Sequence, residues 1–319
     1  MFRKSPCTGY CTVDSKGSQK CIGCLRTMDE ILNWGRYSSH RMDEAQRELP
    51  GRRARYDDDH GFIDQMGRKV TCKGPFDRIV SLVPSTTQTL YDLGLEPKVV
   101  GITAFCPTGS TAIPKVKVGG TKNIQMERLH QLQPQLVLGA KEENTKEAIE
   151  EIEKHFAVWM ADTDTLDASL AMIEVLGELL ETNGAAPALV NEIRGGLPRV
   201  AGLYEGTAAY LIWKKPYMCA ARSTFIDSWL WHLGFRNIFG AQERYPETSL
   251  EELVSLGPDV LFLPNEPYNF SPKEQTELQD LLPQSRVLRV DGVPFTWQGS
   301  SMLRALSYFP TLDLDKNEK

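Results

Sequence analysis

Residues 77–94 read DRIVSLVPSTTQTLYDLG, and the hydrophobic pattern changes character inside this stretch. The apolar run from Ile79 to Val83 is short enough for a buried strand, and a helical pattern follows at once and ends at Gly94. The segments KVVGIT (98–103), PQLVLG (134–139) and FAVWM (156–160) repeat the strand pattern. This alternation of strands and helices predicts an α/β fold with a mostly parallel sheet.

A second set of strand patterns begins after a long helical stretch. The segments are TAAYLIW (207–213), DVLFLP (259–264) and SRVLRV (285–290), and the helical stretch covers 166–204 with an interruption at TNGAAP. ERLHQLQPQLVLG (127–139) and EELVSLGPDVLFL (251–263) also share Glu, Leu, Leu and Pro at identical spacing. We therefore expect two similar Rossmann-like lobes joined by a long backbone helix.

The N-terminal end has a different organisation. Four of the seven cysteines, Cys7, Cys11, Cys21 and Cys24, lie there, followed by a helix start with Thr27 as N-cap and Glu30 in a capping box. A second short helix is expected to stop at Pro50, and GRRARYDDDHG (51–61) reads as a linker. The predicted parts are a Cys-rich metal domain (1–55), a linker (56–61), an N-terminal lobe (62–184), the backbone helix (185–205) and a C-terminal lobe (206–319).

Composition limits the class of protein. The chain has 319 residues, 41% hydrophobic, and a net charge of −6, as in ordinary globular proteins. It has no apolar run long enough to span a membrane, and its first residues lack the apolar core of a secretory signal. We therefore expect a cytosolic monomer, in which clustered cysteines are more often metal ligands than disulfides. The basic run RELPGRRAR is interpreted as solvated, so a nucleic-acid partner is not expected.

The lobes resemble a known family. The resemblance rests on residues 77–94, FCP (105–107), VGGTKN (118–123), KEEN (141–144), YLIWKKPYM (210–218) and VDGVPFTWQGS (290–300), in that order along the chain. It is to the helical-backbone (class III) substrate-binding proteins, in the branch that captures cobalamin or iron chelates. It implies two α/β lobes over 62–312, bridged by one helix at about 187–204, with one ligand in the cleft between them.

The residues themselves also indicate where a ligand would bind. In open parallel sheets ligands lie beyond the carboxyl ends of the strands, and these positions carry conspicuous side chains. The predicted ligand-binding residues are Pro84, Ser85, Phe105, Cys106, Lys122, Asn123, Glu143, Asn144, Trp213, Tyr217, Arg222, Glu266, Tyr268 and Trp297. Phe270 and Phe295 are expected beside them.

Aromatic side chains dominate this set, and they suit a large planar ligand such as a corrinoid better than a bare metal ion, which needs several His or carboxylate ligands. Core packing is the alternative role for each aromatic residue alone. Arg222 and Lys122 could anchor an acidic group of the ligand or have only a surface role.

Glu127 and Glu251 match, by position, the lobe-tip glutamates with which the secreted relatives dock onto a permease. The simpler interpretation is a helix start, in which Ser249 caps the helix and Glu252 completes a capping box.

Cys7-x3-Cys11-x9-Cys21-x2-Cys24 offers four thiolates, enough for zinc or for an iron–sulfur cluster. With Asp14, Arg26, Thr27 and Trp34, the pattern resembles a family of short bacterial proteins of unknown function that are predicted to bind iron–sulfur. The first pair is spaced x3 rather than x2, which favours iron–sulfur over a zinc ribbon. Cys72 and Cys219 are expected to be structural, whereas Cys106 could reach a ligand.

No phosphate loop, Ser/His/Asp signature or dinucleotide fingerprint is present, so the sequence does not support an enzyme. The leading hypothesis is a cytosolic binding protein for a corrinoid or metal chelate, fused to a metal-binding cysteine module. One alternative is a corrinoid or chelate reductase fed by an iron–sulfur cluster. The other is an interaction adaptor that binds no ligand.

Overall fold

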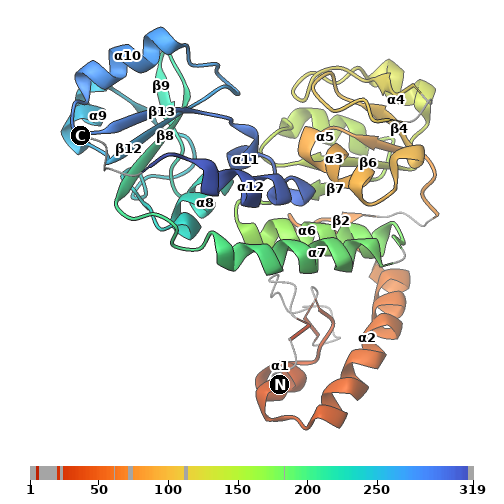
Figure 1. The fold of residues 1–319 in the computed structure, drawn as a ribbon. Coiled ribbons are helices and arrows are strands. Elements are labelled where there is room, and N and C mark those ends of the chain that lie inside the picture. Colours follow the sequence, from red (N-terminus) through yellow and green to blue (C-terminus); the bar gives the residue numbers. More distant parts are fainter. Residues whose placement is uncertain are drawn as a thin grey trace. The chain divides into compact units, whose positions relative to one another are not determined.

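The structure, a computed structural model, describes residues 5–6, 20–21, 24–60, 62–70, 75–110, 114–182 and 184–314 (Figure 1). Two compact units emerge from the contacts within the chain. The N-terminal unit contains Met1–Val83 and Pro97–Asp162, and the C-terminal unit contains Pro84–Glu96 and Thr163–Lys319.

The sheet of the N-terminal unit is parallel, in the order β5-β4-β3-β6-β7. Its strands are β3 (Ile79–Ser81), β4 (Val99–Ile102), β5 (Val116–Lys117), β6 (Leu136–Ala140) and β7 (Val158–Ala161). All residues of β3, β6 and β7 are buried, which explains their near-continuous apolar sequence. The helices α4 (Met126–Leu132) and α5 (Lys146–Glu153) connect the strands.

A short antiparallel pair, β1 (Phe62–Ile63) with β2 (Lys69–Val70), precedes that sheet. The buried Asp64 ties the turn between them to β7: its Oδ2 accepts from Met160 N at 3.2 Å and from Arg68 Nε at 2.8 Å. The hairpin is therefore anchored to the α/β sheet.

The sheet of the C-terminal unit has a parallel centre and an antiparallel edge. Its order is β11-β9-β8-β12-β13, with β10 paired to β8. The strands are β8 (Thr207–Trp213), β9 (Tyr217–Cys219), β10 (Arg236–Asn237), β11 (Glu247–Thr248), β12 (Val260–Pro264) and β13 (Arg286–Val290). Pairings β8–β12, β12–β13 and β8–β10 are parallel, whereas β9 pairs antiparallel with β8 and β11. The predicted α/β class is confirmed in both units.

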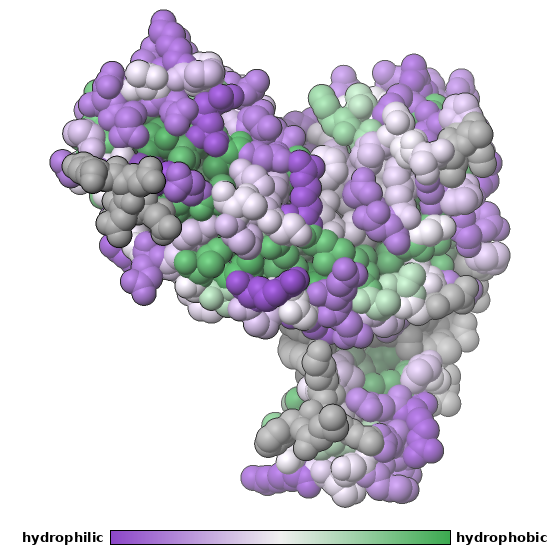
Figure 2. Space-filling model, in the orientation of Figure 1, coloured by the Kyte–Doolittle hydropathy of each residue, from purple (hydrophilic) through white to green (hydrophobic). Residues whose placement is uncertain are grey.

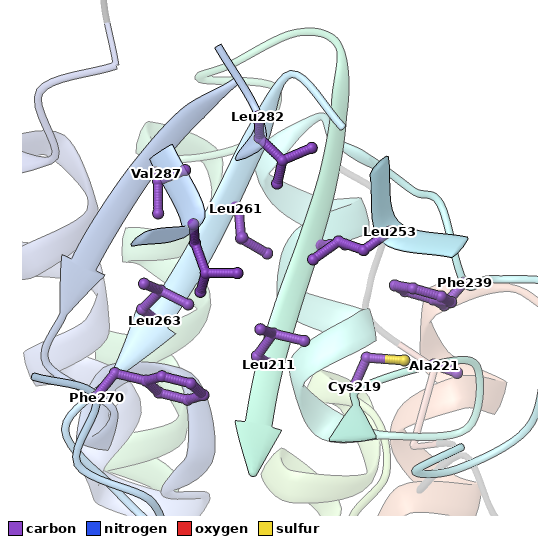
Figure 3. Close-up of a cluster of buried hydrophobic side chains, with 12 residues drawn as sticks. Leu211, Cys219, Ala221, Phe239, Leu253, Leu261, Leu263, Phe270, Leu282 and Val287 are labelled. Atoms are coloured by element: carbon purple, nitrogen blue, oxygen red, sulfur yellow. The ribbon is translucent and has the colours of Figure 1, made fainter. Parts of the chain in front are cut away.

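One apolar cluster fills the space on one side of this second sheet (Figure 3). Leu211, Leu261 and Leu263 point into it from β8 and β12. Phe270 is fully buried in the same cluster, and Phe295, outside this cluster, is fully buried as well. Their expected role as ligand-facing residues is therefore wrong, because both rings are packed in the core.

The helices of the C-terminal unit are α6 (Leu166–Leu179), α7 (Ala185–Gly196), α8 (Phe225–Leu233), α9 (Leu250–Leu256), α10 (Pro272–Leu281), α11 (Val293–Thr296) and α12 (Met302–Tyr308). α6 and α7 lie side by side (Figure 1), close enough that a Cβ on Gly177 would stand 2.3 Å from that of Ala186. α7 ends at Gly196 and a 3-10 turn covers Leu197–Arg199. The expected single helix over 187–204 is therefore shorter than predicted.

The helix α3 (Pro84–Asp92) follows directly from β3, yet it belongs to the C-terminal unit. Ser85 Oγ donates to Gln298 Oε1 at 2.9 Å, and Ser300 N donates to Thr89 Oγ1 at 3.1 Å. The unit boundaries therefore cross those predicted from the sequence, which gave residues 62–184 to one lobe.

Before the first sheet lie α1 (Met28–Asn33), a 3-10 turn (Trp34–Arg36) and α2 (Ser39–His60). Thr27 and Glu30 form the predicted capping box. α2 continues through Pro50, so a helix end at Pro50 and an irregular linker from residue 56 are both contradicted. Two bonds from Arg52 to Glu30, at 2.5 and 2.8 Å, hold the turn after Pro50 against α1.

Candidate functional site

The C-terminal unit gathers aromatic side chains at the carboxyl ends of its parallel strands. Trp213 ends β8 and is 42% exposed, and Tyr268 follows β12. Their rings meet edge to face, with centroids 5.6 Å apart, although 55 positions separate them in sequence. Because β8 and β12 are parallel neighbours, both residues lie at the same edge of the sheet.

Trp297 lies beyond the next strand, after α11, and is fixed by a carboxylate. Its Nε1 donates to Glu266 Oε1 at 3.0 Å, and Thr296 Oγ1 lies 3.4 Å from the same oxygen. Burial raises the pKa of Glu266, against the opposing effect of these two hydrogen bonds. Trp297 and Glu266 are therefore one structural pair.

The remaining predicted residues of this unit have other surroundings. Tyr217, in β9, packs against the apolar cluster of Figure 3, and burial raises its pKa. Arg222 is exposed and forms an ion pair with Glu243 at 2.5 Å. Ser85 is buried and bonded to Gln298, and Pro84 opens α3. Tyr217, Arg222 and Ser85 therefore each have a protein partner within this unit.

In the N-terminal unit, Phe105 follows β4 and is 73% exposed. The next residue, Cys106, is buried with its Sγ 3.0 Å from Thr103 Oγ1. Lys117, which the sequence did not single out, donates to the carbonyls of Thr103 and Cys106 at 3.3 and 3.2 Å. These bonds shape the loop that presents Phe105.

Asn144 is buried with both ends of its amide engaged: Oδ1 accepts from Ala140 N at 2.9 Å, and Nδ2 donates to Thr121 O at 2.8 Å. It connects the end of β6 to the loop that holds Lys122 and Asn123, which are both exposed. Glu143 is half-buried. Asn144 therefore positions a loop, a role that a lone Asn in a sequence does not reveal.

Cys21 and Cys24 lie in one tight turn. Leu25 N donates to Cys21 O at 2.7 Å, Cys21 N donates to Arg26 O at 2.9 Å, and Leu25 has a φ of 54°. Both thiols are buried. A hydrogen bond with Cys21, together with the contacts of Arg26, lowers the pKa of Cys24 to about 5 against the effect of burial.

Arg26 is 4% exposed and contacts this turn directly. Its Nε donates to Cys24 Sγ at 3.3 Å, and its guanidinium carbon lies 4.9 Å from the centroid of the Trp34 ring. Cys7 and Cys11 of the predicted quartet, and Cys72, lie outside the described residues. Within the described ranges, no three His, Cys, Asp or Glu side chains are gathered as metal ligands would be. Cys219 is buried, and burial raises its pKa to about 12.

Glu127 and Glu251 are exposed in the first turns of α4 and α9. Ser249 caps α9 as predicted, because its side chain accepts from Glu252 N at 3.1 Å. The Glu252 carboxylate accepts from Thr248 Oγ1 at 2.8 Å, so the predicted capping box is replaced by a neighbouring bond. None of the described helices combines the length and apolar composition that crossing a membrane requires.

Comparison with known proteins gives two matches along the sequence. Residues 79–289 match the family described as periplasmic binding protein, and residues 5–53 match a family of proteins of unknown function (DUF1289). A vitamin B12-binding protein of Vibrio campbellii is 28% identical over 195 residues, which cover 59% of this chain and 71% of that protein. An uncharacterized ABC transporter substrate-binding lipoprotein of Bacillus subtilis is 26% identical over 62% of this chain and 67% of its own length.

Solved structures share the fold. The periplasmic vitamin B12 binding protein of Vibrio cholerae superimposes with a TM-score of 0.63 at 21% identity, over 73% of this chain and 94% of that one. A periplasmic heme-binding protein from Roseiflexus sp. RS-1 gives 0.61 at 19% identity, over 73% and 96%.

These relatives contradict the expectation of a cytosolic protein, because they are described as periplasmic proteins or as a lipoprotein. A reducing compartment, in which metal ligands are more common than disulfides, can therefore no longer be assumed for the clustered cysteines. The turn at Cys21 and Cys24 is then the remaining structural reason to consider a metal.

Proposed function

Because this chain belongs to the periplasmic binding protein family, we propose that it binds a corrinoid, or another large metal chelate, and that the aromatic edge of the C-terminal unit forms part of the binding site. Several similar proteins are described as vitamin B12-binding or heme-binding, and both ligands contain a large planar macrocycle. The family provides a ligand-binding fold, and the ligand class is the proposal.

The observations that carry this proposal are the contact between Trp213 and Tyr268 and the bond that holds Trp297 to Glu266, all at the carboxyl ends of strands of one sheet. Aromatic rings bury large areas against a flat apolar ligand at a low cost in conformational entropy. Trp213 is exposed although it is large and apolar, and Trp297 is held in place by Glu266. Rings held in fixed positions bind a rigid ligand with little further ordering.

The test is a fluorescence titration of the protein with cobalamin, cobinamide, haem and a ferric hydroxamate. Replacing Trp297 by Ala should weaken binding of the preferred ligand by about 1 to 3 kcal/mol, or roughly tenfold to hundredfold, the usual value of a buried aromatic contact.

Trp231→Ala is the matched control. Trp231 is 78% exposed in the last turn of α8, which leads into the amino end of β10. Its loss should leave the dissociation constant unchanged. Equal weakening by both substitutions would contradict a site at the carboxyl ends of the strands. Binding of none of the four ligands would favour the adaptor alternative.

We also propose that the N-terminal module holds a metal through Cys7, Cys11, Cys21 and Cys24. The turn at Cys21 and Cys24 supports this, because it brings two thiols together and Arg26 donates a hydrogen bond to one of them, which favours the thiolate that binds metals. Zinc would supply structural stability, and an iron–sulfur cluster would supply electron transfer.

Metal analysis of freshly purified protein should find zinc or iron at a constant ratio to protein, and Cys21→Ser with Cys24→Ser should abolish it. A Cys219→Ser variant, in which a buried cysteine of the other unit is replaced, should retain the metal. The visible spectrum of protein purified without oxygen separates the two metals, since only a cluster absorbs there. A redox-silent zinc would exclude the reductase alternative, and absence of both metals would contradict the metal proposal.

A further inference from the structure

The carboxylate of Glu274, in the first turn of α10, receives hydrogen bonds from three other residues. Oε1 accepts from Lys214 Nζ and from Tyr268 OH, both at 2.8 Å. Oε2 accepts from the backbone N and the Oγ of Ser271, also at 2.8 Å. The two oxygens therefore have different partners and different tasks.

Oε2 completes the capping box of α10, in which Ser271 in turn accepts from Glu274 N. A capping box needs nothing more than this, and a glutamine serves in it as well. The bonds to Oε1 go beyond capping. They reach one residue from the loop after β8 and one from the loop after β12.

Each of these two loops carries one ring of the aromatic edge. Lys214 directly follows Trp213, and Tyr268 is itself the partner of Trp213 in the edge-to-face contact. The Lys214 side chain is 17% exposed and that of Glu274 13%, whereas Trp213 is 42% exposed. An ion pair that is largely shielded from solvent thus begins at the residue that follows an exposed ring.

We infer that Glu274 is a positioning residue for ligand binding: it joins the loops after β8 and β12 and so holds Trp213 and Tyr268 in one fixed arrangement. This inference rests on the proposed function, because it concerns the same aromatic edge. Charge-assisted hydrogen bonds are roughly twice as strong as neutral ones. A carboxylate that accepts one such bond from each loop therefore restricts the movement of both loops.

Glu274→Gln is the decisive substitution. The glutamine oxygen can still cap the helix, and its NH2 group then faces the Lys214 ammonium, which has no lone pair to accept a hydrogen bond. The link to the loop after β8 is therefore lost while α10 remains capped. The matched control is Glu252→Gln, at the corresponding position of α9, where the carboxylate contacts only Thr248 among the hydrogen bonds described above.

The experiment uses the full chain labelled with 5-fluorotryptophan, and Trp213→Phe identifies the fluorine resonance of Trp213. Glu274→Gln should shift or broaden that resonance and raise the dissociation constant for cobinamide about tenfold, the effect of releasing one or two ordered side chains. Glu252→Gln should change neither, and thermal unfolding should show similar stability for both variants.

An unchanged Trp213 resonance in Glu274→Gln would overturn the inference, and so would a changed resonance with unaltered cobinamide affinity. If the wild type binds none of the four ligands, the proposed function fails on its own. The fluorine spectrum then still decides the positioning claim, since a shift confined to Trp213 supports it and no shift refutes it.

Discussion

Gly299 lies where the chain passes closest to α3. Its φ is +71°, and a Cβ placed on it would stand 2.0 Å from Thr89 Oγ1. Thr89 is buried and also accepts the bond from Ser300 N, so it has little room to move. Only glycine meets both demands, since a side chain here would combine left-handed strain with a clash.

Gly299→Ala should therefore lower the free energy of unfolding by about 2 to 4 kcal/mol, the sum of left-handed strain and overpacking. Gly202→Ala is the control, because Gly202 has a φ of +61° with nothing within 4 Å of the added Cβ, and should cost about 1 kcal/mol. Urea unfolding measures both. Equal losses would show that backbone strain alone is at work.

For single residues, the sequence indicates which residue types follow the strands, but it does not indicate whether their side chains point into the core or toward solvent. Phe270 and Phe295 follow strands just as Tyr268 does, yet both are fully buried. Which side of a loop an aromatic ring takes depends on packing from other elements. Glu274 shows a similar limit, because Ser271 and Glu274 form a recognisable capping pattern, whereas the bonds to Lys214 and Tyr268 are tertiary.

Among the elements, α2 departs most from expectation. A proline inside a helix removes one hydrogen bond and costs about 3 kcal/mol or more, so Pro50 is a sound reason to predict a helix end. The helix α2 continues past Pro50 because Arg52, with a side chain only 10% exposed, forms two hydrogen bonds to the buried Glu30 of α1. A contact across 22 positions overrides a local preference.

Arg52→Met should therefore free the part of α2 that follows Pro50. Hydrogen exchange of the backbone amides after Pro50 should accelerate by at least tenfold, while those of Ser39–Glu48 change little. Arg41→Gln, which breaks an exposed pair with Glu44 in the first half of α2, is the control and should leave both halves unaltered. Equal acceleration of the two halves by Arg52→Met would indicate general loss of the helix instead.

Strands were predicted better than helices. All seven segments assigned from apolar runs are strands, namely β3, β4, β6, β7, β8, β12 and β13. Most residues of these strands are buried, so each strand appears in the sequence as a short apolar run. The strands β5, β9, β10 and β11 have two or three residues each and give no such signal, since Cys219 of β9 is the one buried residue among them.

For the whole molecule, the two sheets should not depend on the cysteine module. Each has its own buried strands, and the apolar cluster of Figure 3 contains residues of the C-terminal unit alone. The Cys21→Ser, Cys24→Ser variant should thus lose hydrogen-exchange protection in residues 24–52 while β6, β8 and β12 keep theirs. Loss of protection in the strands would mean that the module supports the whole fold.

Figure 2 shows polar and charged residues over much of the drawn face, with apolar residues in smaller groups between them. The family assignment came from an ordered series of short motifs, which a sequence retains well. The predicted cytosolic location was wrong because it was inferred from the lack of a secretory signal and of a membrane span, whereas relatives are described as periplasmic or as a lipoprotein.

The packing of α3 has a consequence for how the protein is made. Thr89 and Ser300 are 211 positions apart, so the ribosome delivers α3 long before its partner exists. At about 5 to 20 residues per second, this helix waits roughly 10 to 40 s during synthesis. The first strand, β3, can meanwhile pair with β4 and β6 as they emerge. The C-terminal unit can therefore close around α3 only after Ser300 has been synthesised, and until then Leu90 and the hydroxyl side chains that this unit buries lack their final packing partners.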